Sequence, residues 1–173
     1  MKLNKFIFLF STFHIAIASF MPLSTVSALE KTTGDIILTV TGNIGQSNTA
    51  DGDAAFDRKS LRQFTPVTIS TKTPWTDGIV QFEGVLIRDL MHALDAKGKI
   101  LHATAADDYS VNIPFEDFKK YNVILAYKMN DKIMASEDQG PFWVIYPWDN
   151  HPELNNDLYH SRAIWQLKTI TVK

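Results

Sequence analysis

The chain has 173 residues, a formal net charge of -2 at pH 7, 45% hydrophobic and 12% aromatic residues, and no cysteine. This length is typical of one domain with a substantial hydrophobic core. The nearly balanced charge lacks the basic surface of nucleic-acid-binding proteins, so we expect no nucleic-acid partner. Without cysteine, the chain has neither a disulfide nor a thiolate to offer a metal ion.

Residues 1–28 have the pattern of a cleaved signal peptide. A basic start, MKLNK, precedes the apolar run FIFLFSTFHIAIASF, and the small residues Val26 and Ala28 follow at a peptidase site. The apolar run is shorter than the roughly 20 residues of a membrane-spanning helix, although an uncleaved anchor is the alternative. We therefore expect residues 29–173 to be a single exported domain in the periplasm, with no membrane span after cleavage.

The remaining sequence predicts a β-rich fold with few helices. Helical spacing that ends near Gly98 predicts the clearest helix over 86–98. Shorter helices are expected over 57–64, with Asp57 as N-cap, and over 115–121. Predicted strands cover 35–42, 66–71, 78–85, 99–109, 110–115, 122–135 (a hairpin), 141–148 and 163–172. Residues 43–56 and 149–162 predict polar loops. The expected class is α+β, a mixed, mostly antiparallel β core with short helices.

Signatures of several enzyme classes are missing from the sequence. It contains no G-x-S-x-G, no G-x-G-x-x-G and no G-x-x-x-x-G-K-[ST]. Serine-hydrolase, dinucleotide-binding and P-loop functions therefore lose their best sequence evidence.

Metal ligands are the next possibility. His92 and His102 are expected to face solvent, and Asp51–Asp57 only faintly resembles a calcium loop, because it lacks the central glycine and the final glutamate. The loop 149–162 carries a set with some metal-binding character: Asp149, His151, Glu153, Asp157 and His160. Their spacing matches no established ligand pattern, so we expect no metal site.

Large aromatic residues beside polar ones favour a flat, hydrogen-bonding ligand. Aromatic rings stack on the faces of such a ligand, and carboxylates and guanidinium groups bind its edges. Plain core packing is the alternative for each ring, and Trp143 and Tyr127 are assigned to the core. The aromatic residues with this character are Trp75, Tyr109, Tyr146, Trp148 and Trp165.

The order of motifs resembles the small exported members of the sulfite oxidase-type molybdopterin-binding domain family. The motifs are FD (56–57), TPWT (73–76), FEGVLIRDLM (82–91), ATAADDYSVNIPFEDF (103–118), VILAYKMNDKIM (123–134), GPFWVIYP (140–147) and YHSRAIWQLKTITV (159–172). The resemblance covers about residues 35–172. The resemblance implies a mixed α/β fold with a β-rich core that holds a pterin.

One departure from the family bears on activity. The resemblance places the molybdenum-ligating cysteine of the full-size enzymes at about Thr71. A threonine hydroxyl cannot replace a thiolate as a molybdenum ligand, so redox activity is in doubt while the fold is not. The basic start MKLNK also lacks the arginine pair of twin-arginine signals, which export preloaded cofactor proteins.

The resemblance and the aromatic residues together predict a periplasmic pterin-binding protein without catalytic residues, which relays pterin occupancy to a membrane-bound sensor enzyme of cyclic diguanylate signalling. Asp108 is the candidate for the guanidine-like edge of the pterin. The predicted pterin-binding residues are Trp75, Asp108, Tyr109, Tyr146, Asp149, Ser161, Arg162 and Trp165. Two alternatives stay open: a molybdopterin-dependent oxidoreductase with an unusual ligand set, and an adaptor that docks through the loop 149–162.

Overall fold

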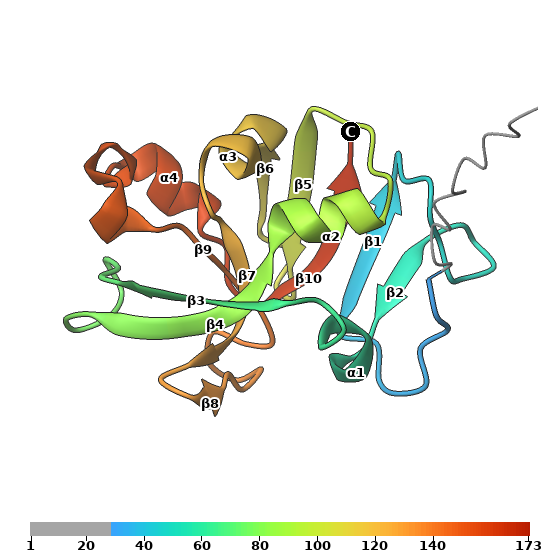
Figure 1. Ribbon diagram of the computed structural model, residues 1–173, viewed down its shortest axis with the longest axis horizontal. Coiled ribbons are helices and arrows are strands. Elements are labelled where there is room, and N and C mark those ends of the chain that lie inside the picture. Colours follow the sequence, from blue (N-terminus) through green and yellow to red (C-terminus); the bar gives the residue numbers. More distant parts are fainter. Residues whose placement is uncertain (1–28) are drawn as a thin grey trace, which may run out of the picture.

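The computed structural model describes residues 29–173, and the predicted signal peptide lies outside the described residues. Two β-sheets enclose a shared hydrophobic core, and short helices cover their edges (Figure 1). This arrangement confirms the expected α+β class with a mostly antiparallel core. Within the described residues, no helix is long and apolar enough to cross a membrane.

The first sheet has the strand order β2-β1-β10-β5-β6. Its strands are β1 (Leu38–Gly42), β2 (Ala54–Phe56), β5 (Ile100–Ala105), β6 (Ser110–Pro114) and β10 (Leu167–Val172). β1 and β10 pair in parallel, and the other pairs of this sheet are antiparallel. Alternation explains these strands: in β5, Leu101, Ala103 and Ala105 are buried, whereas His102 faces outward and contacts Asn112.

The second sheet has the order β3-β4-β7-β8, and β9 pairs with β7 on its other side. Its strands are β3 (Pro66–Thr71), β4 (Val80–Leu86), β7 (Ile124–Met129), β8 (Lys132–Ile133) and β9 (Trp143–Ile145). β9 is completely buried, which explains why the surrounding sequence is a continuous apolar run. Gly84 lies against the carbonyl of Leu125, where a side chain would clash.

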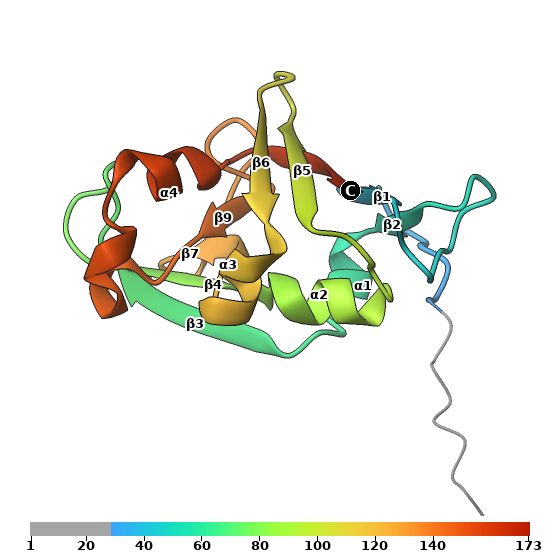
Figure 2. The same cartoon turned by 90° about the horizontal axis from the view of Figure 1, so that it is seen from above.

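The helices are α1 (Arg58–Leu61), α2 (Ile87–Ala93), α3 (Phe115–Lys120) and α4 (Asp157–Arg162), with short 3-10 turns η1 (Trp148–Asn150) and η2 (Pro152–Leu154). Figure 2 shows α2 and α3 side by side along one edge, and α4 apart from them. Asp57 caps α1 as predicted, because its carboxylate accepts a hydrogen bond from the Ser60 backbone N–H.

Three sequence predictions are wrong. The loop 43–56 contains the buried strand β2, and the loop 149–162 contains α4, η2 and the end of η1. The helix predicted over 86–98 is shorter, because β4 continues to Leu86 and the helix ends at Ala93. Gly98 is not its cap; a side chain there would clash with the backbone of Lys173.

Candidate functional site

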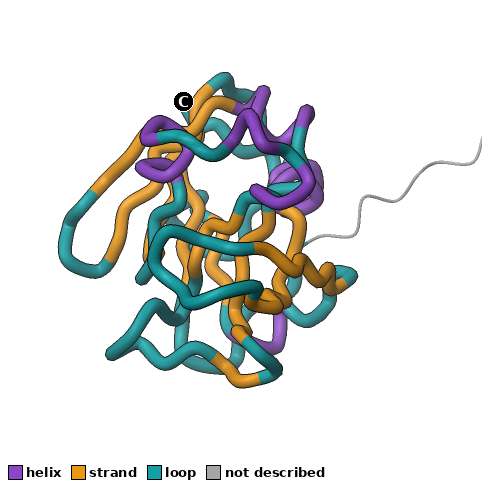
Figure 3. The backbone as a smooth tube through the Cα atoms, turned by 90° about the vertical axis from the view of Figure 1, so that its left-hand side faces the viewer, coloured by secondary structure: helices purple, strands orange, loops and turns teal. Residues whose placement is uncertain are grey.

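An open cavity of about 340 Å³ is lined in part by α4. This helix lies at the end of the molecule that faces the viewer in Figure 3. Three segments distant in sequence form the cavity: the turn after β3, the β5–β6 bend, and α4 with the stretch that leads into β10. Its volume is in the usual range for small-molecule sites. The lining residues are Trp75, Ala105, Asp107, Tyr109, His160, Ser161, Ala163, Ile164 and Trp165.

Two exposed tryptophans form a right-angled corner in this cavity. The rings of Trp75 and Trp165 are 5.4 Å apart with an interplanar angle of 82°. The buried ring of Trp143 supports both, at 5.8 Å from each, and its indole N–H donates to the Ala163 carbonyl. Trp75 is 40% exposed and Trp165 is 38% exposed, so both keep surface for a ligand. A flat ligand can stack on one ring while its edge meets the other.

Polar groups border the aromatic corner. Asp107 lines the cavity from the β5–β6 bend. Asp108, which the sequence predicted for the ligand edge, is not among the lining residues, and it takes a positive φ of 67° at the bend. Ser161 lines the cavity from α4 and donates its hydroxyl proton to the Leu158 carbonyl, so its oxygen remains free to accept. The cavity therefore combines stacking surface, a carboxylate and a hydroxyl oxygen.

A second open cavity of about 580 Å³ adjoins the first. His160 lines both cavities and contacts Trp75 and Trp148 through its ring, at centroid distances of 6.0 Å and 6.1 Å. The indole N–H of buried Trp148 has no hydrogen-bond partner among the described residues. The residues that line the second cavity are Lys72, Thr73, Pro74, Trp148, Asp149, Pro152, Asn155 and His160.

Thr71, at the end of β3, is completely buried beside the second cavity. Its hydroxyl oxygen accepts a hydrogen bond from the Asp149 backbone N–H at 3.1 Å and donates to the Lys72 carbonyl at 3.2 Å. The Asp149 carboxylate in turn accepts from the Lys72 backbone N–H at 3.3 Å. The side chain of Thr71 thus joins β3 to the start of η1.

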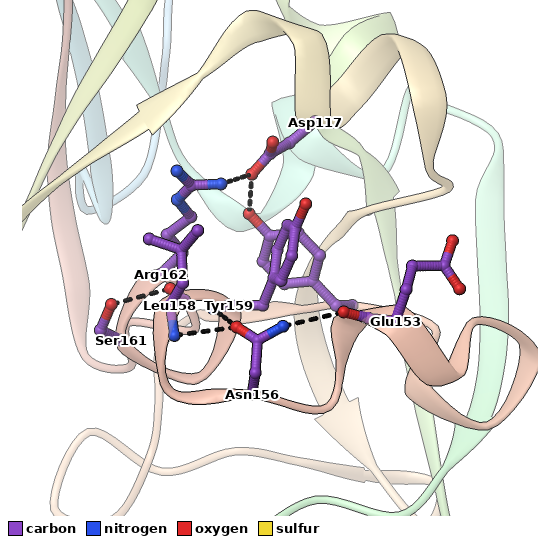
Figure 4. A network of polar contacts seen from close by, with 8 residues as sticks. Asp117, Glu153, Asn156, Leu158, Tyr159, Ser161 and Arg162 are labelled. Carbon is purple, nitrogen blue, oxygen red and sulfur yellow. Dashed lines mark hydrogen bonds and ion pairs between the residues drawn. The ribbon is translucent and has the colours of Figure 1, made fainter.

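Two residues predicted to contact the ligand are engaged elsewhere. Tyr146 is completely buried, and its hydroxyl donates to Asp117 at 2.7 Å. Burial, reinforced by the charge of Asp117, raises the pKa of Tyr146 and keeps it protonated. Arg162 donates to the same carboxylate oxygen at 2.8 Å (Figure 4). Neither Tyr146 nor Arg162 lines the two cavities.

Within residues 29–173, no three histidine or acidic side chains are grouped closely enough to hold a metal ion. In the loop 149–162, the His151 ring and the Glu153 carboxylate lie 3.5 Å apart. His92 is exposed on α2.

Several of the predicted pterin-binding residues lie in the walls of these cavities. Trp75, Tyr109, Ser161 and Trp165 do come together around one cavity, and Asp149 lies in the wall of the other. The sequence analysis missed Asp107, because the geometry of the β5–β6 bend is not visible in a residue pattern. It also missed that His160 lines both cavities, because the helix α4 that carries His160 was not predicted.

The fold and the site define a β-rich α+β domain with an aromatic, polar-edged ligand cavity. Residues 51–149 match the family model described as oxidoreductase molybdopterin binding domain, and this match covers more than half of the chain. The chain therefore belongs to the oxidoreductase molybdopterin-binding domain family, as its motifs predicted. A search of curated proteins found no match.

The residues of this chain do not fit the molybdenum of the family's cofactor. The chain has no cysteine, and the side chain at the predicted thiolate position, Thr71, is buried and hydrogen-bonded to Asp149. A neutral hydroxyl held in this way is a poor ligand for a soft metal centre. The aromatic corner, by contrast, suits the flat pterin part of the cofactor.

Proposed function

We propose that this protein is a periplasmic pterin-binding protein that performs no redox chemistry of its own. The observation that carries the proposal is the corner of Trp75 and Trp165, which opens into a cavity with Asp107 on its border. A pterin has two flat faces and a guanidine-like edge. Stacking on an indole accounts for the faces, and two parallel N–H bonds to a carboxylate account for the edge.

The loss of redox chemistry follows from the position of Thr71. Since its hydroxyl holds the Asp149 backbone, the chain uses this position for structure and offers no thiolate there. The alternative, a molybdopterin-dependent oxidoreductase, is favoured by the family match to residues 51–149. Metal analysis of the protein purified from its native periplasm separates the two, because stoichiometric molybdenum would support the oxidoreductase.

Isothermal titration calorimetry of residues 29–173 with neopterin and with a tetrahydropterin tests the binding function directly. We expect saturable binding with one site per chain. If neither compound binds at millimolar concentration, the proposed function is wrong.

The proposed role in the cell is to report pterin occupancy to a membrane-bound sensor enzyme that makes or degrades cyclic diguanylate. This part rests on the resemblance to short exported relatives and on the signal-peptide pattern of residues 1–28. Cyclic diguanylate is measured in cells that express the wild type or Trp75→Ala. A level that depends on Trp75 supports the relay. If Trp75→Ala binds no pterin but leaves the level unchanged, the protein acts as an adaptor that docks independently of ligand.

A further inference from the structure

Residues 149–162, which we name the strap, contribute to the walls of both cavities. Nearly all of the strap lies beyond the residues that match the family. Its backbone hydrogen bonds, such as Leu154 to His151 and His160 to Asn156, stay within the strap or reach its immediate neighbours in sequence. Among the described residues, none joins the strap backbone to the backbone of either sheet. Side chains must therefore fix where the strap lies.

The first attachment is at the start of the strap. Thr71 accepts a hydrogen bond from the Asp149 N–H, and the Asp149 carboxylate accepts one from the Lys72 N–H. This reciprocal pair ties the strap to the end of β3. Because Thr71 is completely buried, its hydrogen bond is shielded from competition with water.

The second attachment is at the end of the strap. The carboxylate of Asp117, on α3, accepts from Arg162 and from Tyr146 at the same oxygen. The side chains of Asp117 and Arg162 are only 8% and 14% exposed, so removal of either charge would leave the other largely buried and uncompensated. Between the two attachments, the strap is held by the buried side chain of Leu154 and by a 3.3 Å hydrogen bond from Tyr121 to Glu153.

We propose that Thr71 and Asp117 are positioning residues for the ligand cavity. They hold the two ends of the strap and thereby place His160 and Ser161 against the aromatic corner. Of the residues that the sequence assigned to ligand contact, three act through these attachments: Tyr146, Asp149 and Arg162. The inference rests on the proposed function for the identity of the ligand, but the attachments themselves are properties of the free protein.

The placement of the strap determines the apparent affinity for the ligand. A ligand that needs the strap in place binds with an apparent affinity reduced by the fraction of molecules in which the strap is correctly placed. Loss of one attachment lowers that fraction, and loss of both lowers it further. A general loss of stability would act on the sheets as well, which provides a way to distinguish the two effects.

Hydrogen–deuterium exchange of the ligand-free protein tests the positioning role. Thr71→Val removes the hydroxyl at nearly constant volume, Thr71→Ser keeps it, and Asp117→Asn removes the charge. We expect exchange of the amides of residues 149–163 to rise by about three- to tenfold in Thr71→Val and in Asp117→Asn, and not in Thr71→Ser. The neighbouring variant Glu116→Gln is the control, since Glu116 is exposed and, within residues 29–173, forms an ion pair only with Lys119.

Neopterin affinity is measured on the same variants and on the double variant Thr71→Val with Asp117→Asn. We expect the double variant to bind at least about tenfold more weakly than the wild type, with Thr71→Ser and Glu116→Gln unchanged. If the double variant does not fold, the two single variants are compared in its place, and each is expected to bind more weakly than Glu116→Gln.

Two results overturn the proposal. One is exchange that rises equally in β4 and β7, which would make the two residues general stabilisers. The other is folded variants that lose the attachments and still bind neopterin as tightly as the wild type. If the wild type itself binds no pterin, the proposed function fails, while the exchange comparison still decides whether Thr71 and Asp117 position the strap.

Discussion

Truncation of Trp75 tests the aromatic corner most directly. Trp75→Ala removes one of the two indole rings that line the cavity and leaves Trp165 supported by Trp143. Loss of one stacking ring from a heterocycle site costs about 1–3 kcal/mol, so we expect neopterin to bind roughly 5- to 150-fold more weakly. The change is measured by isothermal titration calorimetry.

The same substitution has a separate cost in stability. Trp75 packs edge-on against Trp165 and at a tilt against Trp143, and aromatic pairs of this kind contribute about 0.5–1.5 kcal/mol each. The free energy of unfolding should therefore fall by about 1–3 kcal/mol in a denaturant titration. The 40% exposure of Trp75 lets water fill the space left behind, which limits any further cavity penalty.

A matched control separates the two effects. Phe115→Ala removes a partly buried ring that packs on Phe118 and lines neither cavity. It should lower stability without weakening neopterin binding. If folded Trp75→Ala binds within about twofold of the wild type, the stacking role of this corner is refuted.

Three further predictions concern the carboxylate that binds the ligand edge, the position of the family's molybdenum-ligating cysteine, and stability in acid. Asp107→Asn should weaken neopterin binding by about tenfold or more in calorimetry, because a charged acceptor is lost, whereas Asp108→Asn should bind like the wild type. If Asp108→Asn is instead the variant that loses affinity, the ligand edge is bound by Asp108, as the sequence predicted. Thr71→Cys should carry no molybdenum in elemental analysis, since the side chain at this position is buried against Asp149 rather than free to ligate. The backbone N–H of Ser60, with further backbone donors, holds the pKa of Asp57 well below its ordinary 3.8. The stability that ionised Asp57 contributes is therefore present above about pH 4 and is lost as the pH falls. In acid titrations followed by circular dichroism, Asp57→Asn should lose less stability than the wild type, and an equal dependence of stability on pH would contradict this.

The strands that alternate or form long apolar runs could be predicted from the sequence. β3, β7 and β10 lie close to their expected positions, because hydrophobic periodicity reports directly which face is buried. β2 was missed because its three residues, Ala54–Phe56, are buried on both faces and too short to show alternation. α4 was missed because none of its residues is buried, although Asn156 is a normal N-cap residue.

The candidate site was also predicted only in part from the sequence. Trp75 and Trp165 were predicted because exposed aromatic residues beside polar ones are visible in sequence. The choice between Asp107 and Asp108 depends on a positive φ at the bend, which two adjacent aspartates do not reveal. Tyr146 and Arg162 looked available for a ligand because their common partner, Asp117, is distant from both in sequence.

The clustering of indole rings also means that tryptophan spectroscopy reports on one end of this molecule. All four tryptophans of the chain lie in or directly behind the walls of the two cavities. Intrinsic fluorescence is therefore a label-free reporter of what happens at this end, and the near-perpendicular pair of Trp75 and Trp165 should add a near-ultraviolet dichroism signal of its own. The sheet formed by β1, β2, β5, β6 and β10 contains no tryptophan, so its melting needs a different probe, such as backbone dichroism.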